Sequence, residues 1–111
     1  MIQTHTKRVG LPEYGHFLIL AKSRRFPGEF CFLVDRKQNQ NQWWQSQTEG
    51  AMIFTSLNAV EQTLRLYVHN TPMIVTLEEA LWVEKNYNNK SYQEAVTGLV
   101  VYNKNKGVAC Q

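Results

Sequence analysis

The first half of the chain alternates short apolar runs with turn signals, a pattern that predicts an antiparallel β-meander. Two apolar, β-prone runs span residues 16–24 and 29–36, and the segment Phe26-Pro27-Gly28-Glu29 lies where they meet. Proline presets φ at the second position of a turn, and glycine accepts the positive φ of the third position in a type II turn. We therefore expect a β-hairpin with a tight turn at Pro27 and Gly28.

The position of this turn sets the expected pairing of the two strands. If Phe26 and Glu29 flank the turn, Ala21 lies opposite Val34. One face of the hairpin is then apolar core, formed by Phe17, Ile19, Ala21, Phe30, Phe32 and Val34. The other face mixes apolar and charged side chains: Leu18, Leu20, Lys22, Arg24, Cys31, Leu33 and Asp35. A solvated face is normally polar, so we expect a helix, another subunit or a partner to cover half of this second face.

The meander continues beyond an uncharged tract rich in Gln and Asn that begins at residue 38. A third strand is expected at about 42–47 and a fourth at about 50–54, with the turn signal Thr48-Glu49-Gly50 between them. Residues 1–15, with two glycines and a proline, read as an irregular lead-in. The sequence thus predicts a sheet of three to four strands.

Helical spacing replaces this pattern in the second half. Thr55 or Ser56 can cap a helix over about 56–68, and residues 73–75 form a short buried strand or an extended link. Two capping boxes then predict helices at about 77–87 and 91–99: Thr76 with Glu79, and Ser91 with Glu94. A strand over residues 99–102 remains an alternative to the end of the last helix. The fold class is α+β, with two to three helices packed on one face of the sheet.

The composition is that of an ordinary globular protein, with 111 residues, 43% hydrophobic and 19% charged. This length predicts one domain over residues 1–111. No apolar run approaches the roughly 18 residues of a membrane span, and the first eight residues lack the apolar region of a signal peptide. We therefore expect a cytoplasmic protein with no membrane partner. Cys31 and Cys110 fit no zinc motif and are expected to be free thiols.

Charge is unevenly distributed along the chain. Seven basic and three acidic residues precede residue 38, whereas residues 38–97 hold three basic and six acidic residues. A basic hairpin can grip phosphates, which makes a nucleic-acid-binding module the alternative function. Its candidate residues are Lys22, Arg24, Arg25, Arg36 and Lys37, with Phe26 available for stacking. The same charges also fit a plain solvated surface that discourages aggregation between strand edges.

Catalytic and metal-binding patterns are missing from the sequence. None of His5, His16 and His69 has a partner at metal-ligand or triad spacing. Cys31 lies near the hairpin tip while His16 lies at its far end, so they make no nucleophile–base pair. Glu78 and Glu79 are adjacent, and adjacent helical carboxylates do not face each other. We expect no enzymatic activity, no cofactor and no metal.

The adjacent pair Trp43-Trp44 is the strongest local indication of a binding surface. Neighbouring side chains of a strand point to opposite faces, so one tryptophan can be core while the other is open. Trp is enriched at interface hot spots, and the uncharged flanks favour a protein partner over nucleic acid. Trp82 and Tyr87 either extend such a surface or pack against a neighbouring helix.

The leading prediction is a small non-enzymatic interaction protein that binds another protein or forms a homodimer through a sheet face. The expected contact residues are Trp43, Trp44, Leu18, Leu20 and Leu33. A third interpretation is a small-ligand-binding domain with an apolar pocket between sheet and helices. The size, the Asn, Gln and Lys content and the lack of catalytic motifs are typical of small bacterial mobile-element proteins, and no family motif supports a closer resemblance.

Overall fold

Strand β1 (Tyr14–Lys22) is the centre of an antiparallel sheet. The computed structural model describes residues 10–23, 28–34, 44–45, 47–87 and 91–105. β1 pairs with β4 (Phe54–Ser56) near its start, with β5 (Met73–Thr76) in its middle and with β2 (Phe30–Leu33) near its end. β3 (Trp44–Gln45) pairs with β2. The α+β class and the sheet-then-helices order are confirmed, and residues 73–76 prove to be a strand of this sheet.

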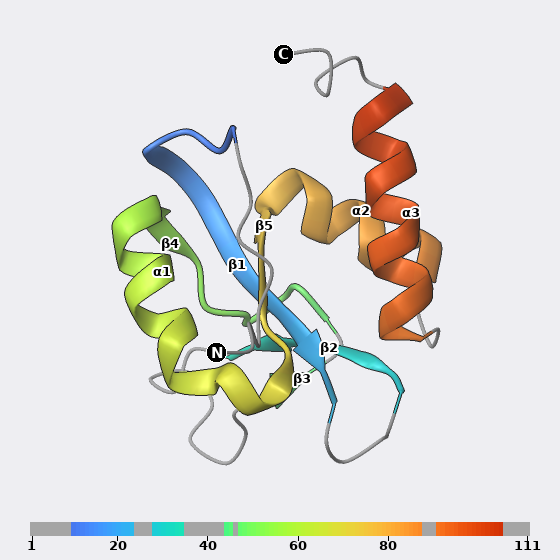
Figure 1. Cartoon of the computed structure of the whole chain (residues 1–111), viewed down its shortest axis with the longest axis horizontal. Coiled ribbons are helices and arrows are strands. Elements are labelled where there is room, and N and C mark those ends of the chain that lie inside the picture. Colours follow the sequence, from blue (N-terminus) through green and yellow to red (C-terminus); the bar gives the residue numbers. More distant parts are fainter. Residues whose placement is uncertain (1–9, 24–27, 35–43, 46, 88–90, 106–111) are drawn as a thin grey trace, which may run out of the picture.

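Both faces of the sheet are covered by helices (Figure 1). Side chains alternate along β1, so that Leu18 and Leu20 point to one face while Phe17 and Ile19 point to the other. Helix α1 (Leu57–Leu64) packs on the second of these faces through Val60 and Leu64. Helices α2 (Leu77–Tyr87) and α3 (Tyr92–Asn105) pack on the first. The helices therefore divide between the two faces instead of sharing one, which differs in this detail from the expected packing.

Each face has its own buried cluster. The α3-side core consists of Leu18, Leu20, Phe30, Phe32, Ala51, Met73, Val75, Ala80, Val83, Tyr92, Ala95 and Leu99. The α1-side core consists of Phe17, Ile19, Leu33, Phe54, Val60, Leu64 and Ile74. The continuous apolar run in β1 is explained by this double coverage, because a strand buried on both faces needs no polar positions.

The predicted pairing within the hairpin is wrong by three residues. Ala21 lies opposite Cys31 rather than Val34, and Ser23 N donates to Glu29 O at 2.8 Å. The connection therefore spans more residues than a tight turn, although Gly28 does take the positive φ expected of it, +93°. An odd shift exchanges the faces of one strand relative to the other. Phe30 and Phe32 consequently share a core with Leu18 and Leu20.

The helix starts follow the predicted caps. Ser56 Oγ accepts from Ala59 N at 3.1 Å and begins α1, which passes into a 3₁₀ segment (Arg65–Asn70) kinked at Tyr67. α2 has the predicted bounds. α3 continues to Asn105, so residues 99–102 are helical and the strand alternative is wrong. No helix among the described residues is long and apolar enough to cross a membrane.

Candidate functional site

Helices α2 and α3 lie side by side on the outer layer of the α3-side core, and their facing side chains form the candidate site (Figure 1). Near the start of α2, Glu79 Oε2 accepts from Asn103 Nδ2 at 2.6 Å. Further along, the rings of Trp82 and Tyr102 stack with their centroids 4.5 Å apart at 23°. These contacts run in opposite sequence order along the two helices, so the helices form an antiparallel pair.

The last residue of α2, Tyr87, closes the other end of this seam against Gly98 of α3. A Cβ built at position 98 would collide with the Tyr87 hydroxyl and with two ring carbons beside it. Any larger residue at position 98 would therefore have to displace the Tyr87 ring. The Tyr87 ring also lies 5.5 Å from Trp82, tilted at 57°. Three aromatic rings thus line one seam: Trp82, Tyr87 and Tyr102.

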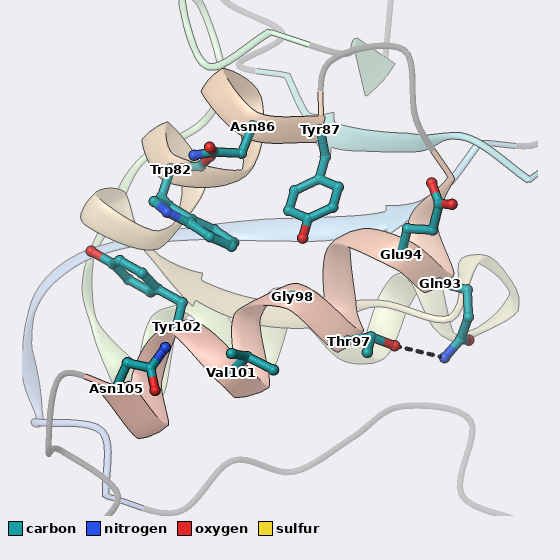
Figure 2. A pocket seen from close by; sticks show the side chains of 10 residues that line it. All are labelled: Trp82, Asn86, Tyr87, Gln93, Glu94, Thr97, Gly98, Val101, Tyr102 and Asn105. Carbon is teal, nitrogen blue, oxygen red and sulfur yellow. Dashed lines mark hydrogen bonds between the residues drawn. The ribbon is translucent and has the colours of Figure 1, made fainter.

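A cavity of about 890 Å³ lies along this seam. Figure 2 shows Trp82 and Tyr102 projecting toward each other from the two helices, with Tyr87 reaching toward the Gly98 turn. The cavity is lined by Trp82, Asn86, Tyr87, Gln93, Glu94, Thr97, Gly98, Val101, Tyr102 and Asn105. We call this cavity and its lining residues the aromatic groove.

Most of the remaining lining residues are polar but uncharged. Asn86 Nδ2 donates to Trp82 O at 2.8 Å, and Gln93 Nε2 donates to Thr97 Oγ1 at 3.5 Å. Among the described lining residues, Glu94 alone is formally charged at neutral pH. Aromatic faces with a few amides and hydroxyls form the lining that organic ligands usually meet in proteins.

The residues predicted to form a sheet-face interface are divided by the structure. Leu18, Leu20 and Leu33 are at most 2% exposed, beneath the helices. A side chain with no exposed surface offers nothing to a partner in this fold, so these leucines leave the candidate surface. Trp44 is half-buried against the α1-side core, edge to face with Tyr67 at 5.3 Å and 85°. Trp43 lies outside the described residues.

Only one of the predicted basic residues falls within the described part of the chain. Lys22 ends β1, exposed, with Nζ 5.8 Å above the ring of Tyr92. This distance lies near the outer limit of a cation–π contact, which at an exposed site contributes about 0.5–1 kcal/mol. Arg24, Arg25, Arg36 and Lys37 lie outside the described residues. The nucleic-acid interface therefore stays a prediction.

Burial raises the pKa of two groups near the start of α3. Desolvation raises the pKa of the Cys31 thiol to about 12, and it raises the pKa of the Tyr92 hydroxyl to about 12, with a smaller contribution from Cys31. The thiol donates to Ala21 O at 3.6 Å and the hydroxyl to Thr71 O at 2.9 Å. Such a thiol is held as a packing group, not as a thiolate. No group of three His, Cys, Asp or Glu side chains that could hold a metal occurs within the described ranges.

Sequence reasoning found part of the groove and missed the rest. The sequence predicts Trp82 and Tyr87 as aromatic candidates, whereas it gives no such indication for the residues of α3. A helix over the whole of 92–105 would have placed Gly98, Val101, Tyr102 and Asn105 on one face, at spacings of three and four. Because residues 99–102 could be either helix or strand from the sequence, this stripe was not predicted.

Comparison of the chain with protein-family models, with curated proteins and with solved structures found no match.

Proposed function

We propose that this protein is a non-catalytic binding protein and that its aromatic groove takes a small organic ligand. The observation that carries the proposal is the cavity of about 890 Å³ between α2 and α3, lined by Trp82, Tyr87 and Tyr102. Binding sites for small molecules usually measure about 300–1,000 Å³ and combine aromatic walls with a few polar groups. The groove has this size and this chemistry.

The support for a ligand comes from what the rings leave uncovered. Trp82, Tyr87 and Tyr102 are half-buried although they touch one another. Partial exposure is common for Trp and Tyr, but each exposed Å² of these rings forgoes about 25 cal/mol of burial. A ligand seated in the groove would bury this remaining aromatic area.

A protein partner is the second candidate, and it now rests on the same two helices. Helices cover most of both sheet faces, and among the described strand residues the open aromatic surface is that of Tyr14, 75% exposed, and of the half-buried Trp44. Three large apolar side chains stand exposed on α2 and α3 instead: Leu81 at 50%, Val100 at 62% and Val101 at 51%. Self-association would bury them, and light scattering across micromolar concentrations tests this. A monomer at every concentration would contradict it.

The ligand proposal is tested by a fragment screen read by NMR. Binders should shift the indole N–H of Trp82 and the amides of Thr97 and Gly98 together. Replacing Trp82 with alanine should abolish those shifts, because it removes the central ring of the groove. Trp44→Phe is the matched control, since Trp44 packs on the opposite side of the sheet, and it should bind as the parent does.

Circular dichroism must first show that Trp82→Ala folds. If it unfolds, Val101→Asp is the substitute variant, because Val101 lines the groove and is half exposed. It should weaken fragment binding. A screen in which no aromatic or apolar fragment moves the groove resonances would overturn the proposed function. Binding that survives both groove substitutions would do so as well.

A further inference from the structure

Glu94 gives the aromatic groove a negative charge. It is the one formally charged residue among the described lining residues, whereas the chain as a whole carries a net charge of +3. No described Lys or Arg lines the cavity to neutralise it. A groove whose described lining has a carboxylate and no basic group favours a cation over an anion, because an unpaired anion would have to leave water without a counter-charge.

The Glu94 carboxylate is not used by the fold in the way that its sequence position predicts. In a complete capping box the glutamate side chain reaches back to the backbone N–H of the cap residue. At α3 only half of the box forms, with Glu94 N donating to Ser91 Oγ at 3.0 Å. The side chain is exposed, and the start of α3 is held instead by Tyr92 N donating to Gly28 O at 2.6 Å.

Aromatic faces supply the second attraction for a cation. An ammonium group within about 6 Å of a Trp or Tyr ring centroid is attracted by the ring quadrupole. Tyr102 stacks on one face of Trp82, so a cation can reach only the remaining face of Trp82, which Tyr87, tilted at 57°, covers in part, and the open face of Tyr87 itself. The chain already makes this contact once, between Lys22 and the ring of Tyr92.

We infer that the ligand of the aromatic groove is a small organic cation, whose alkylammonium group lies against the ring of Tyr87, which stands between Trp82 and Glu94 (Figure 2), with Glu94 as its counter-charge. This inference rests on the proposed function. The amide oxygens of Asn86 and Gln93 can accept hydrogen bonds from a protonated amine. A quaternary ammonium group has no N–H to donate, so the aromatic rings and the Glu94 charge alone would hold it. An anionic ligand finds no described basic partner in the groove.

Three probes of the same shape and different charge test this inference. Choline, its neutral carbon isostere 3,3-dimethyl-1-butanol and the anion 3,3-dimethylbutyrate are titrated separately, and the Trp82 indole shift is followed. Choline should bind about two- to fivefold more tightly than the neutral isostere, as a partly exposed cation–π contact implies. The anion should bind most weakly of the three.

The variant Glu94→Gln then isolates the counter-charge. It should reduce the preference for choline over the isostere at least twofold and leave the affinity for the isostere unchanged. Gln93→Glu is the converse variant, and it should raise the preference because it adds a second carboxylate to the lining. High salt should weaken choline binding and leave the isostere unaffected.

The outcomes separate the two levels of the proposal. Equal binding of choline and the isostere at the groove, or tighter binding of the anion, overturns the cation inference and leaves the groove as a binding site. A preference for choline that Glu94→Gln does not reduce overturns the assigned role of Glu94. Failure of all three probes, together with a failed fragment screen, overturns both the inference and the proposed function.

Discussion

The two helices of the groove begin with the same sequence pattern and use it differently. At α2, Glu79 is only 3% exposed, and its Oε1 accepts from Thr76 N at 2.9 Å while Glu79 N donates to Thr76 Oγ1 at 3.1 Å. Its second oxygen accepts from Asn103 of α3. At α3, Ser91 accepts from Glu94 N, and the Glu94 carboxylate stays at the surface beside the groove.

Burial decides which of the two carboxylates becomes structural. A buried carboxylate must be satisfied by hydrogen bonds, because desolvating an unpaired charge is costly. Glu79 meets this need with donors from its own helix start and from α3, and so it joins α2 to α3. Glu94 is solvated and has no such need, which leaves its charge available to a ligand. A capping-box pattern in a sequence therefore specifies a helix start without specifying the role of its carboxylate.

The largest expected effect comes from removing the buried carboxylate. Glu79→Ala strips Thr76 N and Asn103 Nδ2 of their acceptor, and should lower the free energy of unfolding by about 2–4 kcal/mol. Glu79→Gln is the control, because an amide oxygen can still cap Thr76 N, and it should cost less than half as much. Urea unfolding followed by circular dichroism measures both. A cost for Glu79→Ala no greater than for Glu94→Ala would break the comparison.

The next largest effect tests the close approach of α2 and α3 at Tyr87 and Gly98. Gly98→Ala should normally stabilise a helix by about 1 kcal/mol, but the clash with Tyr87 should turn this into a net loss of about 1 kcal/mol. In a Tyr87→Ala background the clash is absent, so the same substitution should become neutral or stabilising. Urea unfolding of the four proteins gives this double-mutant cycle. A stabilising Gly98→Ala in the parent would contradict the close approach.

Alkaline pH should lower the free energy of unfolding, which urea unfolding at a series of pH values measures. The folded-state pKa of Tyr92 is raised to about 12 by burial, above the unfolded value of about 10. Between those values the unfolded chain has released the proton that the folded one keeps, so stability is full below pH 10 and falls as the pH rises toward 12. The loss at pH 11 should be about 1 kcal/mol.

Tyr92→Phe is the matched variant for this pH dependence. It lacks the hydroxyl that donates to Thr71 O, so it should be less stable at pH 7 but show a shallower decline above pH 10. Cys31 contributes to the same decline because its pKa is raised as well, and Cys31→Ala should flatten a further part of it. An unchanged alkaline slope in both variants would show that neither group is buried as described.

Local patterns predicted much of the fold because its elements begin and end on local chemistry. The caps at Ser56, Thr76 and Ser91 and the alternation along β1 each depend on residues a few positions apart. The hairpin register failed because it depends on loop length: Ser23 closes on Glu29, and no local preference of Pro27 and Gly28 sets that distance. The expectation that the helices share one face of the sheet was incomplete for a related reason. Which face each helix covers is decided by long-range packing on β1.

The candidate site was less predictable than the fold. The Trp43-Trp44 pair drew attention because its members are adjacent in sequence, whereas Trp82 and Tyr102 become neighbours only when α2 and α3 pack together. The apolar face assigned to an interface proved to be the underside of helices, since Leu18 and Leu20 are buried by α2 and α3. A strand that is apolar on both faces indicates that both faces are covered, and here the helices of the same chain cover them.

The smallest effect on stability distinguishes a structural role of Glu94 at the start of α3 from a role in ligand binding. Ser91→Ala removes the acceptor for Glu94 N and should cost about 1 kcal/mol, the usual cost of losing a cap. Glu94→Gln keeps that backbone bond and only neutralises an exposed side chain, so its cost should stay below about 0.5 kcal/mol. Urea unfolding measures both, and the same Glu94→Gln protein should still lose part of its preference for choline. A stability loss as large as that of Ser91→Ala would make Glu94 a structural cap like Glu79, and the two helix starts would then be alike.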